Sequence, residues 1–168
     1  MDALETIFTR RRVREFTDQP VSDNTINQIL KAAMSAPSAT GKKPWHFIVI
    51  KNKEILFKIP KVHPHAQASA SANLVIIPCA DPKLAHKNFW PLDLAAASQN
   101  ILLAVRALDL GAVWCGVYPD EERMNAIRTL LKIPQDIMPL CVIPIGHTKV
   151  EQASKDCFMP KRIHHDTW

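Results

Sequence analysis

Four short apolar runs, separated by segments of helical character, constrain the fold of this chain most strongly. Each run has the length of a buried strand. They cover His46–Ile50, Leu74–Ala80, Ala112–Val117 and Leu140–Ile145. Because helical segments alternate with these runs, the order predicts a single domain of mixed α and β structure.

Prolines in two of the runs limit how those strands can pair. Pro78 and Pro144 lack the N–H that a strand donates to its neighbour, so we expect an edge or a bulge at each position. A parallel doubly wound sheet is the default for the alternating order. The chain has only 4 glycines and no GxGxxG turn, however, so a nucleotide would have to be held in another way.

Capping and turn residues predict where the helices begin and end. Ser22 and Asp120 are good N-caps, and Pro37 ends the helix that Ser22 begins. Gly111 suits a left-handed residue after the long helix. The helices are expected at Asp2–Thr9, from Ser22 to before Pro37, at Asp93–Leu110 and from Asp120 to about Leu131, with one more between the first two strands.

The 168 residues suit one domain over 1–168, since no linker or repeat divides them. A net charge of +5 favours anionic ligands, either phosphates or nucleic acid. Four cysteines without a CxxC pair point to a reducing cytoplasm rather than to zinc. No signal-peptide core and no apolar stretch of ~20 residues is present, so we expect no membrane association.

The last segment, about residues 150–168, has no helical or strand periodicity. It nevertheless keeps the apolar residues Phe158, Ile163 and Trp168. An exposed tail seldom retains such anchors, so we expect this tail to pack on a partner subunit.

The sharpest local feature is the run Arg10-Arg11-Arg12-Val13-Arg14. Four guanidiniums in five residues repel one another unless water or an anion separates them. Arginine binds phosphate oxygens through two parallel hydrogen bonds. A solvated basic turn or a nucleic-acid patch is the competing interpretation, and charge alone favours it.

Two further segments could contact a ligand. The loop Ala36–Trp45 offers the Ser38 hydroxyl and a flexible glycine, and Gly111–Pro119 could present backbone N–H groups to a flat ligand. Each also fits an ordinary connection. Cys115 is a weak nucleophile candidate because no base can be assigned to it. No histidine spacing indicates a metal site, and no serine–histidine–aspartate arrangement has supporting context.

Taken in order, these segments resemble the nitroreductase family in its short form. The resemblance covers nearly the whole chain, and the ordered set is specific although each piece is weak. The matching segments are Arg10–Phe16, Ala36–Ala39, Pro44–Phe47, Asp93–Ala104, Leu110–Pro119, Pro144–His147 and Met159–His164.

The resemblance implies an α+β fold with a mostly antiparallel central sheet flanked by helices, in an intertwined homodimer with two FMN sites at the interface. It also implies the cofactor-binding residues. The arginine segment would hold the FMN phosphate and pyrimidine edge, the serine loop would come from the other subunit, and the remaining segments would reach flavin N5 and the phosphate. These residues are Arg10, Arg11, Arg12 and Arg14; Pro37, Ser38 and Ala39; Trp114, Cys115 and Gly116; Gly146 and His147; and Lys161 and Arg162.

Two departures from the family pattern affect the polar contacts. Arg12 stands where the family usually has serine, and Lys43 replaces one of two amide side chains before Pro44-Trp45. Both changes could alter substrate or cofactor preference.

The implied activity is hydride transfer from NAD(P)H through flavin N5 to an acceptor such as a nitroaromatic or a quinone, with ping-pong kinetics and no catalytic side chain. The alternatives are a flavin-storage protein without turnover, a basic nucleic-acid-binding domain, and a specialised reductase or dehalogenase of the same family.

Overall fold

The computed structural model describes residues 1–168 and is built on one antiparallel sheet. Its strand order is β1-β2-β6-β3, with β4 also paired to β6 and β5 to β2. The parallel sheet that the alternating order favours is therefore wrong, and the antiparallel sheet implied by the resemblance is confirmed. The strands are β1 (Trp45–Ile50), β2 (Leu74–Ala80), β3 (Gly111–Ala112), β4 (Cys115–Gly116), β5 (Met138–Pro139) and β6 (Cys141–Gly146).

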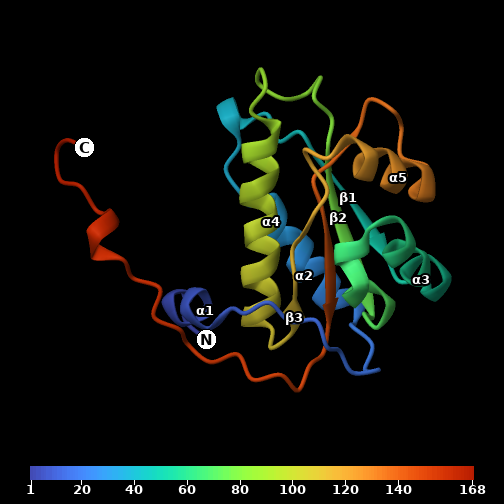
Figure 1. The fold of residues 1–168 in the computed structure, drawn as a ribbon, viewed down its shortest axis with the longest axis horizontal. Coiled ribbons are helices and arrows are strands. Elements are labelled where there is room, and N and C mark those ends of the chain that lie inside the picture. The colour runs from blue at the N-terminus through green and yellow to red at the C-terminus, as the bar shows by residue number, and fades with distance from the viewer.

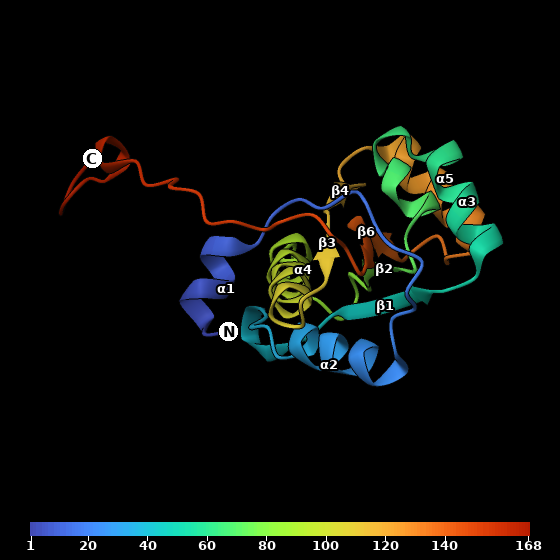
Figure 2. The same ribbon diagram turned by 90° about the horizontal axis from the view of Figure 1, so that it is seen from below.

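Helices cover both faces of this sheet. Figures 1 and 2 show α2 and α4 on one face and α3 and α5 on the other, with α1 beside α4. The helices are α1 (Ala3–Thr9), α2 (Asp23–Met34), α3 (Lys53–Val62), α4 (Trp90–Ala107) and α5 (Glu121–Leu131), and the short 3-10 helices are η1 (Ala39–Gly41), η2 (Pro64–Ala70) and η3 (Pro160–Arg162).

The two layers of helices make two apolar cores, and β2 contributes to both. Leu74 and Ile76 pack with α2 and α4, whereas Val75 and Ile77 pack with α3 and α5. Side chains alternate across a strand, so a strand covered on both faces must be apolar at every position. This explains the uninterrupted apolar run of β2, all of which is buried.

Each strand proline lies where a neighbouring strand is interrupted. Pro78 faces the gap between β6 and β5, where Leu140 N donates to Pro78 O at 2.9 Å. Pro144 faces the gap between β3 and β4 in the same way. Neither strand is at the sheet edge, so the interruption of the neighbour accommodates the missing N–H in both cases.

Most helix signals are confirmed. The Ser22 and Asp120 side chains accept hydrogen bonds from the first turns of α2 and α5. The long helix α4 begins earlier than expected, at Trp90, with a proline in its first turn. The left-handed conformation predicted for Gly111 is wrong: Asp109 has the positive φ of 55°, and Gly111 belongs to β3.

The end of the chain leaves the body of the molecule. Figures 1 and 2 show it passing α1 and running outwards. Residues 153–168 are all exposed, and Trp168 is 100% exposed. No helix in the structure has both the length and the apolarity that are needed to cross a membrane.

Candidate functional site

The arginine segment runs along the outer edge of β3. Val13 N donates to Ala112 O at 2.9 Å, and Arg12 forms a parallel bridge with Ala112. Gly111 allows this close approach, because a Cβ at Gly111 would lie 2.6 Å from Val13 Cγ1. The arginine segment is therefore held against the sheet and does not form a flexible turn.

Two backbone N–H groups point outwards from the same edge. Val113 N and Val117 N donate to carbonyls on the β6 side, Pro144 O at 3.3 Å and Leu140 O at 3.0 Å. Because alternate residues of an antiparallel strand bond to the same side, the N–H groups of Trp114 and Gly116 point away from β6. A Cβ built on Gly116 meets nothing within 4 Å, so open space lies beside this residue.

The four guanidiniums of the arginine segment have no acidic partners. None of the four ion pairs in the structure includes Arg10, Arg11, Arg12 or Arg14. Arg12 and Arg14 are exposed, while the side chain of Arg11 turns inwards and its Nη2 is buried without a hydrogen-bond partner. Unpaired positive charge together with an unsatisfied buried donor is suited to binding an anion.

Cys115 lies within the site but is not a nucleophile. Burial raises the pKa of its thiol to about 11, although the nearby Arg14 guanidinium acts in the opposite direction. Its Sγ contacts His65 O at 3.4 Å. The thiol is therefore protonated at neutral pH, which argues against a role as a nucleophile.

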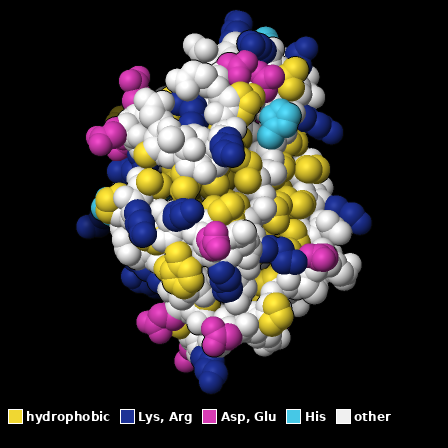
Figure 3. Space-filling view, turned by 90° about the vertical axis from the view of Figure 1, so that its right-hand side faces the viewer, with side chains coloured by type: hydrophobic (Ala, Val, Ile, Leu, Met, Phe, Trp, Pro, Cys, Tyr) yellow, Lys and Arg dark blue, Asp and Glu magenta, His cyan; other side chains and the backbone are white.

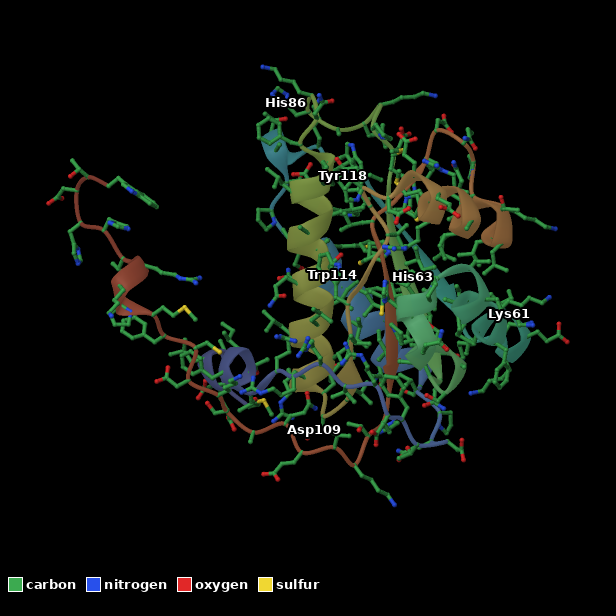
Figure 4. The ribbon with its side chains drawn as sticks, in the orientation of Figure 1. Lys61, His63, His86, Asp109, Trp114 and Tyr118 are labelled. Carbon is green, nitrogen blue, oxygen red and sulfur yellow. The ribbon has the colours of Figure 1, made fainter.

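Two residues without a predicted role meet the carbonyl of Gly116. His63 Nε2 and Arg123 Nη1 both lie 3.0 Å from Gly116 O. Burial and the charge of Arg123 lower the pKa of His63, so its ring is neutral at neutral pH. In Figure 4, Trp114 lies beside α4 and His63 lies towards α3. No local sequence signal could have found this contact, because it joins residues 53 positions apart.

The serine loop lies at the other end of α4. Ala39 N donates to Asp93 Oδ1 at 2.7 Å, in the first turn of α4, and Ser38 Oγ accepts a hydrogen bond from Lys43 N. Arg106 Nε, in the last turn, donates to Thr9 Oγ1 beside the arginine segment. Asp93 and Arg106 are thirteen residues apart, which separates the two ends by ~20 Å. One chain therefore does not bring Pro37, Ser38 and Ala39 to the arginine segment (Figure 1).

Within one chain, the remaining predicted ligands fall into two groups: Gly146 and His147 lie beside the continuation of the arginine segment, whereas Lys161 and Arg162 lie apart from it. Gly146 is buried in β6, where a Cβ would lie 3.0 Å from Phe16, so this glycine is needed for close packing. The backbone carbonyl of His147 accepts a hydrogen bond from Thr17 N. Lys161 and Arg162 lie on η3 in the exposed tail, away from the body (Figure 1). The roles of these four residues remain predictions.

This arrangement is that of a flavin-binding oxidoreductase fold, and comparison with known proteins agrees. The pattern that defines the Nitroreductase family matches residues 7–76 and 70–147. A protein of Methanothermobacter thermautotrophicus, provisionally named NADH dehydrogenase/NAD(P)H nitroreductase, is 48% identical over 100% of this chain and 88% of its own length. The chain therefore belongs to the nitroreductase family.

Solved structures support the same assignment. A protein from Parabacteroides distasonis with the same provisional name is 38% identical, with a TM-score of 0.94 over 98% of both chains. A provisionally named nitroreductase from Desulfovibrio desulfuricans, solved in complex with FMN, is 28% identical with a TM-score of 0.84, over 98% of this chain and 96% of that one. The nitroreductase-like fold expected from the sequence is thus confirmed.

Proposed function

We propose that this protein is an FMN-dependent oxidoreductase that passes hydride from NAD(P)H to a small electron acceptor such as a nitroaromatic or a quinone. One observation carries the proposal. The unmatched guanidiniums of the arginine segment and the outward N–H groups of Trp114 and Gly116 lie along one edge of the sheet. This edge offers an anion site at one end and neutral hydrogen-bond donors at the other.

FMN fits this combination of groups. Arg12 and Arg14 supply charged donors for a phosphate or for the carbonyl edge of a pyrimidine ring. Trp114 N–H and Gly116 N–H supply donors to a planar heterocycle, and the space beside Gly116 permits close approach. When bound, the flavin supplies the hydride chemistry, so the protein needs no catalytic side chain. This agrees with the protonated, unreactive thiol of Cys115.

The complete site requires a second copy of the chain. Within one copy, ~20 Å of α4 separates the serine loop from the arginine segment. Several large apolar side chains on α1 are exposed as well, at 63% for Leu4 and 55% for Phe8. A hollow of about 320 Å³ next to them is lined by Ile7, Leu103 and other residues of α1 and α4. We propose a homodimer that covers this face and brings each serine loop to the other copy's arginine segment.

The tail would extend the same interface. Its apolar residues Phe158, Ile163 and Trp168 touch little of their own chain. The outer edge of β1 has no strand partner, and an apolar hollow lies beside it between α3 and α5 (Figure 3). Two adjoining cavities of about 440 and 500 Å³ form this hollow and share Ile48, Leu131 and Lys132. We propose that the partner's tail packs there as an added extended segment.

Two measurements test the activity. The purified protein should be yellow and should release one FMN per chain on denaturation. NADH and NADPH should each be tried as donors with a quinone and a nitroaromatic, and initial rates at several acceptor concentrations should give the parallel double-reciprocal lines of ping-pong kinetics. A colourless protein that binds no added FMN would overturn the proposal. Bound FMN without NAD(P)H oxidation would favour storage over catalysis.

Light scattering on the holoprotein tests the dimer. A chain that ends after Gln152 should dissociate more readily and lose FMN, because the tail and its basic pair, Lys161 and Arg162, would be missing. A monomer that binds FMN with undiminished affinity would contradict the shared site. The free, mostly buried thiols favour a reducing cytoplasm as the location, which we include in the proposal.

A further inference from the structure

The carbonyl of Gly116 is held by two donors that do not belong to the sheet. His63 follows the last turn of α3, and Arg123 lies in the first turn of α5. Both donate to Gly116 O at 3.0 Å. The two helices belong to the layer on the far side of the sheet from α4, so the contact joins that layer to the candidate site.

Two donors are more than the carbonyl of Gly116 needs for its hydrogen bonding. One donor is enough for a carbonyl at a strand edge, and Arg123 already supplies it. His63 is 0% exposed, and its Nδ1 is buried without a partner. An unsatisfied buried ring nitrogen lowers stability, and an aliphatic side chain of similar size would avoid that loss. A histidine at this position therefore serves something other than packing.

Arg123 is itself fixed in place. Its Nη2 pairs with Asp120 Oδ2 at 3.0 Å, while Asp120 Oδ1 accepts a hydrogen bond from the backbone N of Arg123. The guanidinium is thus tied to the N-cap of α5. Since the side chain of His63 is enclosed by protein, both donors approach the carbonyl from set directions.

The held carbonyl restrains the outward N–H indirectly, because the two groups belong to adjacent planar peptides that meet at the Cα of Gly116. In an extended strand, the N–H and C=O of one residue point to the same side, so both groups of Gly116 face away from β6. Glycine has the widest backbone freedom, and without restraint the peptide planes on either side of Gly116 could rotate. Val117 N, bonded to Leu140 O, fixes one side of the next peptide, and the two donors fix the other.

We propose that His63 and Arg123 are positioning residues, which hold the Gly116 carbonyl and thereby aim the Gly116 N–H at flavin N5. The proposal rests on the proposed FMN site. The two residues touch neither substrate nor cofactor in this assignment. Their effect is to keep one hydrogen-bond donor aligned with the atom that accepts the hydride, since a misaligned donor stabilises developing charge less.

The test uses three variants of the FMN-loaded protein and a control. His63→Leu removes one donor at similar volume, His63→Gln keeps an N–H donor, and Arg123→Met removes the other donor. Lys61→Ala is the control, because Lys61 is exposed on the last turn of α3 and points away from the body (Figure 4). The readouts are the ¹⁵N resonance of N5 in bound labelled FMN, the FMN dissociation constant, and the rate of flavin reduction in a stopped-flow instrument.

We expect His63→Leu and Arg123→Met to move the N5 resonance towards that of FMN without a hydrogen bond at N5, and to slow flavin reduction about tenfold. The FMN dissociation constant should change less than about twofold, since one neutral N–H contact is a small part of the binding. His63→Gln should recover most of both losses, and Lys61→Ala should match the wild type.

Wild-type values of the N5 resonance and reduction rate in both His63→Leu and Arg123→Met would overturn the proposal. If His63→Leu does not fold, Arg123→Met decides by the same criteria. A failure of the proposed function is distinguishable, because the wild-type protein would then bind no FMN or would not be reduced by NAD(P)H.

Discussion

The inner strand β2 and the outer β3–β4 run have similar apolar sequences but differ in their backbone hydrogen bonding. All residues of β2 are buried, and the strand has neighbours on both sides. The β3–β4 run pairs with β6 on one side. On its outer side, beyond the single bridge between Arg12 and Ala112, it offers the N–H groups of Trp114 and Gly116 to a ligand. Buried side chains with fully paired backbone therefore identify the core. Backbone N–H groups without a strand partner identify the candidate ligand site.

The largest expected effect concerns stability and falls on β2. Ile76→Ala should lower the free energy of unfolding by ~2–5 kcal/mol, because Ile76 is fully buried and the truncation leaves a cavity. Urea denaturation of the FMN-free protein measures the change. Val49→Ala is the matched control, since Val49 is 38% exposed on β1 and should lose far less. Equal losses in the two variants would remove the distinction between the core and the edge.

The next largest effect concerns binding and falls on the outer edge. Arg14→Ala should weaken FMN binding by ~1.5–3 kcal/mol for each charged hydrogen bond lost, with little change in stability. Titration of FMN into the FMN-free variant checks this prediction. Lys58→Ala, at an exposed position of α3, should bind FMN as the wild type does. Unchanged affinity in Arg14→Ala would reject the ligand role of the arginine segment.

A pair of glycines in the same run should respond in opposite ways. Gly111→Ala should cost ~1–3 kcal/mol of stability, because its Cβ would lie 2.6 Å from Val13 Cγ1 and displace the arginine segment. Gly116→Ala should leave stability unchanged or raise it by ~0.4–1 kcal/mol, since its Cβ meets nothing within 4 Å. Its Cβ should instead hinder FMN. Urea denaturation and FMN titration of both variants separate the two effects.

The smallest expected effect is a loss of stability in mild acid. The pKa of His63 is lowered in the folded chain by burial, by Arg123 and by the neighbouring His65. Above pH 6.5 the ring is neutral in both states. As the pH falls below 6.5, the unfolded chain takes up the proton first, so stability falls by up to ~1.4 kcal/mol per pH unit until the folded pKa is reached.

Urea midpoints of the FMN-free protein at several pH values between 7 and 5 measure this slope. His63→Gln should have a shallower slope over the same range because it has no ring to titrate. His165→Gln is the control, since His165 lies in the exposed tail, away from His63. A wild-type slope in His63→Gln would show that the buried ring is not the group responsible.

The sequence predicted the four apolar strand runs, most helix starts and the position of the arginine segment, because these features depend on local patterns. The structure divides the run Ala112–Val117 into β3 and β4, and the two-residue β5 carried no sequence signal. The N-caps at Ser22 and Asp120 are confirmed. The prediction of a left-handed residue at Gly111 is wrong for a local reason. A glycine that follows a helix can either end that helix with a left-handed conformation or begin a strand where a neighbouring segment packs closely. Only the contact with Val13 distinguishes the two.

The contacts that complete the candidate site depend on distant residues and carried no sequence signal. Ala39 meets Asp93 across 54 positions, and Gly116 meets His63 across 53. A histidine or an aspartate among apolar residues has many possible roles, and only the packed chain shows which backbone atom it reaches. The inward turn of Arg11, opposite to Arg12 and Arg14, likewise follows from the pairing of this segment with β3.

The length of α4 has a genetic consequence if the proposed dimer is correct. In this dimer, the arginine segment and the serine loop of one chain contribute to different FMN sites, because α4 separates them. An Arg14→Ala chain and a chain disrupted at Ser38 therefore have defects in different parts of the shared sites. Co-expression of these two impaired chains would yield mixed dimers in which one FMN site carries both changes and the other carries neither. Such dimers would be more active than either impaired chain alone, so the enzyme would show complementation between subunits.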